Sequence, residues 1–410
     1  MDVIVAKKAG FCFGVKRAMN ISEKAADENE KPIRTHGQVV HNPQAIERLK
    51  ELGVEPIKDL KEMDSGTLII RAHGVPPEVY KEAERKKLKM LDATCPFVKR
   101  AQDYAKTLSE EGYSVVIIGE KDHPEVKGIK GHAGLKAVVI ETVEEAEAIP
   151  FSAKIGVAIQ TTQDKELVKK LLCVLLDKTK ELRVFNTICS ATQERQAAVR
   201  ELSETADVII VVGGKNSGNT QRLHQIASGK VPAYHIERPE EIKQEWLKGA
   251  KLVGVTAGAS TPDFVIMDVV SHLKGSSTYE TAIAVFVEDG KVLLEERDVT
   301  RKIYPHTWLF PGGFVHEGEK PDGAIKRRMK EELGVEITKT SPILVIEDKK
   351  ATPGKTYKHT LYLVEWTGKV ACRHQQKLEW FASNELPKNK LPPIFAEKLG
   401  EIIEAINANA

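Results

Sequence analysis

The sequence predicts an α/β protein made of three related βα repeats around a central cavity, followed by a smaller α+β domain. Apolar runs of strand length alternate with amphipathic stretches over about the first 270 residues. A cysteine recurs once per repeat in a similar local context. From residue 279 the pattern changes to a hairpin followed by longer strand-like runs. Repetition at a near-constant period favours one pseudo-threefold assembly over three unrelated domains.

Each repeat has the same order of elements: strand, cysteine, helix, strand, polar loop, helix, strand and polar loop. We expect the repeats at about 1–90, 91–182 and 183–272, a linker at 273–278 and the second domain at 279–410. The expected elements of the first repeat are a strand at 3–5, helices near 15–29 and 43–52, and a strand at 67–70. The expected strands of the later repeats are 115–118, 155–159, 208–212 and a run that begins at 252.

The cysteines lie where an apolar run gives way to a helix-like segment. Cys12 and Cys95 share the pattern C-x-x-V-K-R-A, and Cys189 begins a weaker third copy. Two further cysteines fall outside this register. Cys173 lies in an apolar helix-like run and is expected to be a buried small hydrophobic residue, and Cys372 belongs to the second domain.

Polar loops follow the strands at equivalent positions. Gly37, Gly119 and Gly213 are each followed four residues later by a polar residue: His41, His123 and Ser217. In parallel sheets, ligands bind beyond the carboxyl ends of the strands. If the repeats pack around a threefold axis, three cysteines and six polar loops meet at one cavity.

The composition restricts the partners and the compartment. Lys and Arg number 61 against 59 Asp and Glu, and this balance gives no reason to expect a nucleic acid or an anionic membrane as partner. No run approaches the roughly 20 apolar residues of a membrane span, and the apolar start is too short for a secretory signal. Five cysteines in a chain of this length favour the reducing cytoplasm and point to metal binding or catalysis.

Three thiolates from three walls of a cavity suit a soft metal centre. An iron–sulfur cubane normally takes four cysteines, so three would leave one iron open, which is typical of catalysis. A structural zinc with three thiolates and one histidine, His41 or His123, is the alternative. The loops could hold a diphosphate with backbone N–H groups, hydroxyls and imidazoles, although glycine, asparagine and serine are also common in ordinary turns.

Glu125 is the carboxylic acid of this loop set, next to His123 in His123-Pro124-Glu125. Once desolvated, it could donate a proton. Its alternative role is to complement the dipole in the first turn of a helix.

Four segments resemble the LytB/IspH family: 9–15, 92–96, 123–126 and 256–260. The resemblance covers about residues 1–272. It implies a 4-hydroxy-3-methylbut-2-enyl diphosphate reductase, the last step of the methylerythritol phosphate route, which removes a hydroxyl group as water and gives isopentenyl and dimethylallyl diphosphates. It also implies a 4Fe–4S cluster on Cys12, Cys95 and Cys189, and a ferredoxin or flavodoxin as electron donor. The competing reading is a metal-containing diphosphate-binding protein without redox function.

The resemblance further implies roles for individual residues. Glu125 would deliver protons with the help of Thr161 and His123. The residues expected to bind the substrate are His41, His73, His123, Thr161, Ser217, Asn219 and Ser260. The family commonly has a second serine after Ser217, and this chain has Gly218, where only a backbone N–H could act.

The second domain is predicted from a hairpin at 282–294, with Asp289-Gly290 at its turn, a helix at 321–333 and a strand at 360–366. Its segment from Gly313 to Val335 resembles the Nudix box, whose carboxylates share one helical face and hold Mg²⁺ against a diphosphate. Glu331 and Glu332 are the expected ligands, Glu319 flanks them, and Arg327 would orient a glutamate.

The box departs from the Nudix pattern at one position. The glutamate that follows the arginine in the family is Arg328 here, so a cation replaces a ligand or base. Three readings remain: an altered pyrophosphohydrolase, a diphosphate-binding module without turnover, and a prenyl diphosphate isomerase of the same superfold. The last ranks lowest because the chain shows no catalytic cysteine motif of the isomerase kind.

Overall fold

The computed structural model describes residues 1–297, 303–316, 318–371, 377–382 and 385–409. Its residues form two compact units. The larger unit contains 6–248 and 256–262. The smaller contains 1–5, 249–255 and the chain from Asp263 onward. Helix α10 (Asp263–Lys274), at the end of the third repeat, therefore belongs to the same unit as the C-terminal domain.

The first repeat contains a four-stranded parallel sheet in the order β3-β2-β4-β5. Its elements are β2 (Ile33–His36), β3 (Val54–Ile57), β4 (Thr67–Ile70), β5 (Lys89–Asp92), α1 (Phe13–Glu28), α2 (Pro43–Glu51) and α3 (Pro77–Arg85). Alternate residues of β4 enter different apolar clusters. Ile69 packs with residues of α1 and α2, and Leu68 and Ile70 pack with Ala83 of α3. The sheet is therefore buried on both faces, which explains the uninterrupted apolar run at 67–70.

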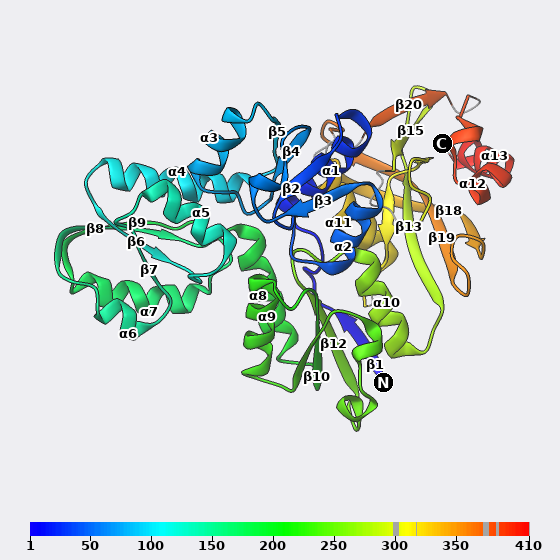
Figure 1. Cartoon of the computed structure of the whole chain (residues 1–410). Coiled ribbons are helices and arrows are strands. Elements are labelled where there is room, and N and C mark those ends of the chain that lie inside the picture. The colour runs from blue at the N-terminus through cyan, green and yellow to red at the C-terminus, as the bar shows by residue number, and fades with distance from the viewer. Residues whose placement is uncertain (298–302, 317, 372–376, 383–384, 410) are drawn as a thin grey trace. The chain divides into compact units, whose positions relative to one another are not determined.

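The second repeat has the same strand order, β7-β6-β8-β9, and all its strands are parallel. Helices α4 and α5 cover one face of this sheet, and α6 and α7 cover the other (Figure 1). Its elements are β6 (Ser114–Ile118), β7 (Val138–Ile140), β8 (Ser152–Ile159), β9 (Thr179–Phe185), α4 (Pro96–Glu110), α5 (Pro124–Ala133), α6 (Val143–Glu147) and α7 (Lys165–Leu176).

The third repeat contributes the parallel pair β10 (Val208–Val212) and β11 (Ala233–Ile236), with α8 (Ser190–Leu202) and α9 (Gly218–Ser228). In the smaller unit, β1 (Asp2–Val5) pairs in parallel with β12 (Leu252–Ala257). The strand that leads into each cysteine thus pairs with the last strand of the preceding copy: β1 with β12, β5 with β4, and β9 with β8. The first strand of the chain belongs by pairing to the third repeat. The prediction of parallel βα repeats is confirmed.

The C-terminal domain has two four-stranded sheets and three helices among its described residues. One sheet has the order β17-β13-β19-β18, and the other has the order β14-β15-β16 with β20 paired to β15. Its elements are β13 (Thr278–Val285), β14 (Val287–Glu288), β15 (Lys291–Glu296), β16 (Trp308–Leu309), β17 (Gly312–Phe314), α11 (Pro321–Glu332), β18 (Glu336–Asp348), β19 (Thr356–Thr367), β20 (Leu378–Ala382), α12 (Pro393–Glu397) and α13 (Leu399–Asn409). Asp289 and Gly290 have φ angles of 50° and 72°, as a two-residue hairpin turn requires, so the predicted hairpin is confirmed around its turn, between β14 and β15. Residues 282–285, which were expected in the same hairpin, belong to β13 and pair with β17 and β19 in the other sheet.

The expectation for Cys173 was wrong, because this residue is exposed. Helix α7 buries Val168, Leu171 and Leu175, which recur at helical spacing, and Cys173 falls outside that stripe. The apolar run around it is therefore amphipathic rather than fully buried. Cys372 lies outside the described residues.

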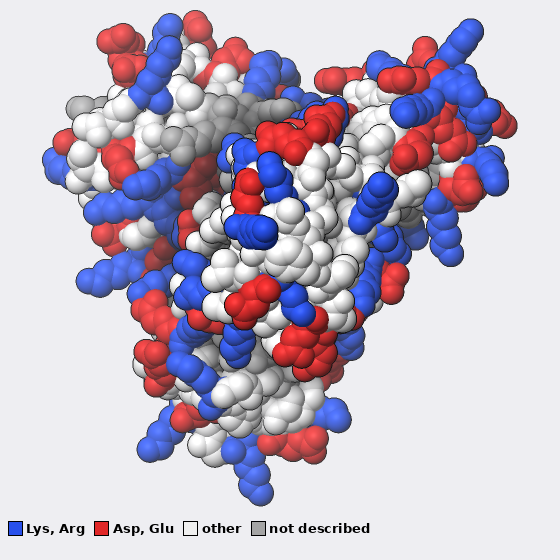
Figure 2. All heavy atoms as spheres, turned by 90° about the vertical axis from the view of Figure 1, so that its left-hand side faces the viewer, with Lys and Arg blue, Asp and Glu red and all other residues white. Residues whose placement is uncertain are grey.

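Charged side chains of both signs are interspersed over the face drawn in Figure 2, as the near-equal numbers of acidic and basic residues would suggest. None of the helices in the described ranges combines the length and the apolar character needed to cross a bilayer.

Candidate active site

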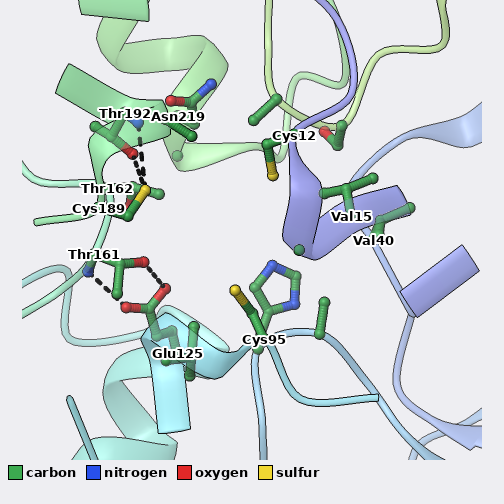
Figure 3. Close-up of a pocket in the computed structure, with 18 of the residues that line it drawn as sticks. Cys12, Val15, Val40, Cys95, Glu125, Thr161, Thr162, Cys189, Thr192 and Asn219 are labelled. Atoms are coloured by element: carbon green, nitrogen blue, oxygen red, sulfur yellow. Dashed lines mark hydrogen bonds between the residues drawn. The ribbon is translucent and has the colours of Figure 1, made fainter. Parts of the chain in front are cut away.

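Three cysteines meet at one cavity of about 100 Å³ in the larger unit. Cys12, Cys95 and Cys189 occupy the N-cap positions of α1, α4 and α8, so each thiol stands at the start of a helix. Figure 3 shows the three sulfur atoms pointing into the same space from different segments. The strand-to-helix corner predicted for each cysteine is the feature that places it there.

The backbone holds the three cysteines in equivalent ways. The N–H of Cys12 donates to the carbonyl oxygen of Ala259 at 3.0 Å, that of Cys95 to Ala72 at 2.9 Å, and that of Cys189 to Thr161 at 3.1 Å. Each acceptor lies two residues beyond the end of β12, β4 or β8. The repeat seen in the sequence is therefore a repeat of hydrogen bonding around the cavity.

Burial keeps two of the three thiols, Cys95 and Cys189, protonated in the absence of a bound cation. Burial raises the pKa of Cys95 to about 12, and burial also raises the pKa of Cys189. The backbone N–H and the hydroxyl of Thr192 lie 3.3 and 3.0 Å from Sγ of Cys189 and partly oppose this rise (Figure 3). Thiolates would form here together with a metal centre, since metal binding releases the thiol protons.

The spacing of the thiols argues against a single zinc ion. Zn–S bonds of about 2.3 Å would bring three sulfur atoms within about 4 Å of one another. In the part of the chain that the structure describes, the only group of three or more His, Cys, Asp or Glu with all ligand atoms within 4.8 Å is His41, His73 and His123. The three cysteine sulfurs do not form such a group, which argues against a shared zinc.

Glu125 is buried beside the thiols, with an exposed fraction of 1%. The backbone N–H of Thr161 donates to one carboxyl oxygen at 2.6 Å, and the Thr161 hydroxyl donates to the other at 3.0 Å (Figure 3). Burial raises the pKa of Glu125 to about 7, although the hydrogen bonds from Thr161 oppose the rise. The carboxyl group is therefore divided between its acid and carboxylate forms near neutral pH.

His123 places Glu125 in the first turn of α5. It is the N-cap of this helix, and its Nδ1 accepts the backbone N–H of Glu125 at 3.2 Å. Pro124 follows at the first helical position, where a missing N–H is tolerated. The tripeptide noted in the sequence is thus a helix start that turns both side chains toward the cavity, which both residues line.

Three histidines form one wall of the cavity. The ring centroids of His41, His73 and His123 lie 4.4 to 5.7 Å apart. Burial lowers the pKa of His41 to about 4 and of His123 to about 3, and it lowers the pKa of His73 well below its usual range. All three imidazoles are therefore neutral at pH 7, and each offers one N–H donor and one lone pair.

Several polar atoms of this wall have no partner in the protein. Both ring nitrogens of His41, Nδ1 of His73 and both amide atoms of Asn219 are buried without a hydrogen bond. Buried polar atoms are nearly always paired in folded proteins. Ser217 and Asn219 stand at the start of α9, where backbone N–H groups favour an anion. The arrangement suits a bound phosphate group.

The hydroxyl group of Ser260 is already engaged, because it donates to the carbonyl oxygen of His41 at 3.0 Å. It would have to rotate to reach a ligand. The structure brings all the predicted reductase residues to one cavity, lined by Cys12, Cys95, Cys189, His41, His73, His123, Glu125, Thr161, Ser217, Asn219 and Ser260.

Sequence reasoning did not single out Arg71 or Gly14. No described carboxylate pairs with the guanidinium of Arg71, which lies close enough to lower the pKa of all three histidines and donates to the carbonyl oxygen of Gly74 at 3.4 Å. A Cβ added to Gly14 would lie 2.5 Å from Sγ of Cys95. Both residues could have been found from their neighbours in the sequence. Arg71 lies two residues before His73, and Gly14 lies two residues after Cys12.

The space beside Gly218 is occupied by Glu120, whose carboxylate oxygens lie 3.1 and 3.2 Å from the position of an added Cβ. A serine here would press against this carboxylate. The glycine at position 218, where the family commonly has a serine, therefore leaves room for the carboxylate of Glu120.

Two of the three carboxylates expected to bind Mg²⁺ in the C-terminal domain, Glu319 and Glu332, are engaged by arginines. Arg327 binds Glu319 through two hydrogen bonds of 2.8 Å. Arg328 lies 2.9 Å from Glu332 on the same helix. Within the described ranges, Glu319, Glu331 and Glu332 do not form a metal-sized cluster.

Comparisons with known proteins agree with both parts of the chain. Residues 3–274 match the LytB protein model, and residues 278–404 match the NUDIX domain model. A 4-hydroxy-3-methylbut-2-enyl diphosphate reductase of Pelobacter propionicus is 49% identical over 274 residues, covering 67% of this chain and 98% of the relative.

Two solved structures of such reductases are also similar. One, described as the terminal enzyme of the non-mevalonate pathway, shares 45% identity with a TM-score of 0.52 and covers 67% of this chain and 99% of its own. The other, from Plasmodium falciparum, shares 29% identity with a TM-score of 0.64 and covers 67% of this chain and 88% of its own. The resemblance drawn from the sequence is confirmed: the chain belongs to the LytB protein family and carries a NUDIX domain after its LytB segment.

Proposed function

We propose that this chain reduces 4-hydroxy-3-methylbut-2-enyl diphosphate to isopentenyl and dimethylallyl diphosphates. One observation carries the proposal: three convergent thiols, a buried carboxyl group and a wall of unpartnered polar atoms share one cavity. The first two features suit a reductive step that consumes protons, and the third suits a diphosphate. The related reductases named above support the same reaction.

Cys12, Cys95 and Cys189 would hold a 4Fe–4S cluster, since three thiols that line one cavity would leave one iron of a cubane without a protein ligand. When bound, such a cluster would supply the electrons of the reduction one at a time. Overall, two electrons and two protons break the C–O bond and release the oxygen as water. A ferredoxin or flavodoxin would supply the electrons.

Glu125 would hold and deliver the protons. Its pKa of about 7 leaves a large share of the acid form at neutral pH, and its burial keeps bulk water from competing. Thr161 orients the carboxyl group by donating to both oxygens. After the proton leaves, the same two hydrogen bonds stabilise the carboxylate.

The histidine wall and the start of α9 would bind the diphosphate. Neutral imidazoles of His41, His73 and His123 donate N–H groups, and the amide of Asn219 and the hydroxyls of Ser217 and Ser260 add further donors. Such a site would bind the diphosphate end of the substrate. Binding at that end would also position the allylic carbon, where the C–O bond breaks.

The experiment is anaerobic purification followed by iron and sulfide analysis and a turnover assay. We expect about four iron and four sulfide per chain, and conversion of the substrate to the two products with a chemical reductant. Zinc at one per chain with no iron, or an intact cluster without conversion, would refute the proposal. The first result would favour the non-redox diphosphate-binding protein instead.

For the NUDIX domain we propose at most weak diphosphate hydrolysis with Mg²⁺. The observation behind this is Arg328, which stands where the box has a glutamate and pairs with the expected ligand Glu332. Mg²⁺ needs open carboxylates at this position.

A further inference from the structure

The NUDIX box contains a buried ionic triad that joins it to α10. The guanidinium of Arg328 lies 3.0 Å from a carboxylate oxygen of Asp263 and 2.9 Å from one of Glu332. The exposed fractions of the side chains are 5% for Arg328, 1% for Glu332 and 23% for Asp263. Asp263 is the first residue of α10, and all three residues belong to the smaller compact unit.

We propose that Arg328 stands in place of the divalent cation of a NUDIX box and uses this position to anchor the start of α10. The box would then be an internal binding site for Asp263 rather than a hydrolytic centre. Arg328 would act as a positioning residue for the LytB segment. This second role depends on the reductase function proposed above, whereas the anchoring itself does not.

The surroundings of Arg328 are shaped around its guanidinium. A Cβ added to Gly313 would lie 2.6 Å from Nε of Arg328, so the glycine leaves the space that the planar group fills. One guanidinium can bind two carboxylates at once with fixed geometry, which a lysine cannot do. Glycine at 313 and arginine at 328 therefore fit each other.

The neighbouring carboxylate is neutralised in the same way. Arg327 holds Glu319 through both of its oxygens. Arg327 is expected to pair with a glutamate in an intact box, so the unusual cation is Arg328, which lies between Glu332 and Asp263. A divalent cation that bound Glu332 would have to displace this guanidinium.

Further contacts fix α10 to the same domain. The hydroxyl of Tyr279 donates to Asp268 at 3.1 Å, and the ammonium of Lys355 pairs with the same carboxylate. The side chain of Ile4 lies 3.5 Å from the position of a Cβ added to Gly318, in the loop of the box. The triad is thus one of several attachments of LytB-segment residues to the NUDIX fold within this unit.

The chain path connects this anchor with the reductase cavity. Residues 256–262 leave the smaller unit after Val255 and return to it at Asp263. This short segment supplies Ala259 and Ser260 to the cavity. Ser260 is three residues from Asp263, so holding Asp263 restricts one end of the segment that presents Ser260. Loss of the anchor should weaken substrate binding before it affects the chemical step.

The test uses the full-length protein and its variants Arg328→Met, Asp263→Asn and Arg328→Glu. Lys326→Met is the matched control, because Lys326 lies on the same helix, is half exposed and pairs only loosely with Asp322 at 4.0 Å. Melting temperatures are measured with and without Mg²⁺ alone. Iron content, KM and kcat are measured for the cluster-loaded enzyme.

We expect Mg²⁺ to leave the melting temperature of the unaltered protein unchanged. Arg328→Met should lower it by roughly 10 °C, since it removes the arginine partner of the buried Glu332 and the partly buried Asp263. Asp263→Asn should lower it less, and Lys326→Met hardly at all. Arg328→Glu should be unstable alone and regain part of the loss with Mg²⁺. Asp263→Asn should raise KM several-fold at unchanged kcat and iron content.

Two results would overturn the anchor: Mg²⁺ stabilisation of the unaltered protein that Glu331→Gln removes, or an Asp263→Asn shift no larger than that of Lys326→Met. If Arg328→Met does not fold, Asp263→Asn still decides, because it keeps the arginine. Unchanged KM in Asp263→Asn would overturn the positioning role alone. Absence of turnover in the unaltered protein would refute the reductase proposal and leave the melting results valid.

Discussion

Thr161 donates two hydrogen bonds to Glu125, one from its backbone N–H at 2.6 Å and one from its hydroxyl at 3.0 Å. The backbone carbonyl of the same threonine accepts the N–H of Cys189 at 3.1 Å. One residue thus fixes both the proposed proton donor and a proposed cluster ligand. Because Thr161 contacts both residues, it holds Glu125 and Cys189 at a fixed distance from each other.

Replacing Glu125 by Gln should abolish turnover and leave the cluster intact. The amide is similar in size but cannot deliver a proton, and loss of a general acid typically costs a factor of about 10² to 10⁴ in rate. Glu147→Gln is the control, since Glu147 is an exposed carboxylate of the same repeat that does not line the cavity. Normal turnover of the Glu125 variant, measured at unchanged iron content, would contradict the proton-donor role.

The same carboxyl group predicts a pH dependence of stability. Burial raises the pKa of Glu125 in the folded protein from its usual 4.5 to about 7, so the native state binds the proton more tightly than the unfolded chain. This contribution to stability is fully present below pH 4.5 and is lost as the pH rises through 7. The total is at most about 3 kcal/mol.

Unfolding free energies measured between pH 5 and 8 check this prediction. The difference between the unaltered protein and Glu125→Gln should change across this range, with the unaltered protein losing stability relative to the variant at higher pH. A difference that does not vary with pH would show that Glu125 titrates normally.

Replacing Arg71 by Met should have opposite effects on the stability of the protein and on its binding of pyrophosphate. Its guanidinium is largely buried without a carboxylate partner among the described residues, and it lies near three neutral histidines. A buried unpaired charge is costly, so Arg71→Met should stabilise the ligand-free protein. It should also weaken binding of inorganic pyrophosphate by about tenfold, because the anion loses a nearby positive charge.

Calorimetry with pyrophosphate and thermal unfolding without it measure the two effects. Arg85→Met is the control, since Arg85 is an exposed arginine at the end of α3. Lower stability together with unchanged pyrophosphate affinity would mean that Arg71 has a structural role only.

The reductase site could be predicted from the sequence because its cysteines and polar loops recur in the three repeats. Cysteines and polar loops recur after equivalent strands, and parallel sheets bring such positions to one edge, so Cys95 and His123 could be placed together without coordinates. The pairing of β1 with β12 could not be read in this way, because the exchange of leading strands between repeats leaves no local pattern. Cys173 was misplaced for a related reason, since an apolar run does not reveal which face of a helix is buried.

The ionic triad was beyond sequence reasoning as well. The sequence showed that Arg328 is unusual, but the partner that gives it a role, Asp263, is 65 residues away and outside any recognisable motif. Charge alone predicted a damaged metal site. The contact with α10 shows what the arginine binds instead.

Hydrolysis by the NUDIX domain should be weak or absent in the unaltered protein and should increase in Arg328→Glu. The substitution removes the cation between Glu332 and Asp263 and adds a carboxylate on the face of Glu331 and Glu332, which favours Mg²⁺. Release of phosphate or pyrophosphate from nucleoside and prenyl diphosphates is the measurement, with Mg²⁺ omitted as control. Rapid Mg²⁺-dependent hydrolysis by the unaltered protein would contradict this prediction.

Gly14→Ala should reduce the iron content of the protein while the fold persists. The added methyl group would lie 2.5 Å from Sγ of Cys95, closer than any non-bonded carbon–sulfur contact allows, so the thiol must shift from the position it has in the cavity. Alanine is otherwise preferred to glycine inside a helix such as α1. Gly400→Ala, in α13, is the matched control because nothing lies within 4 Å of the added carbon there. We expect iron per chain to fall at least two-fold in Gly14→Ala and to stay unchanged in the control. Full iron content in Gly14→Ala would mean that Cys95 has room to retreat and still bind.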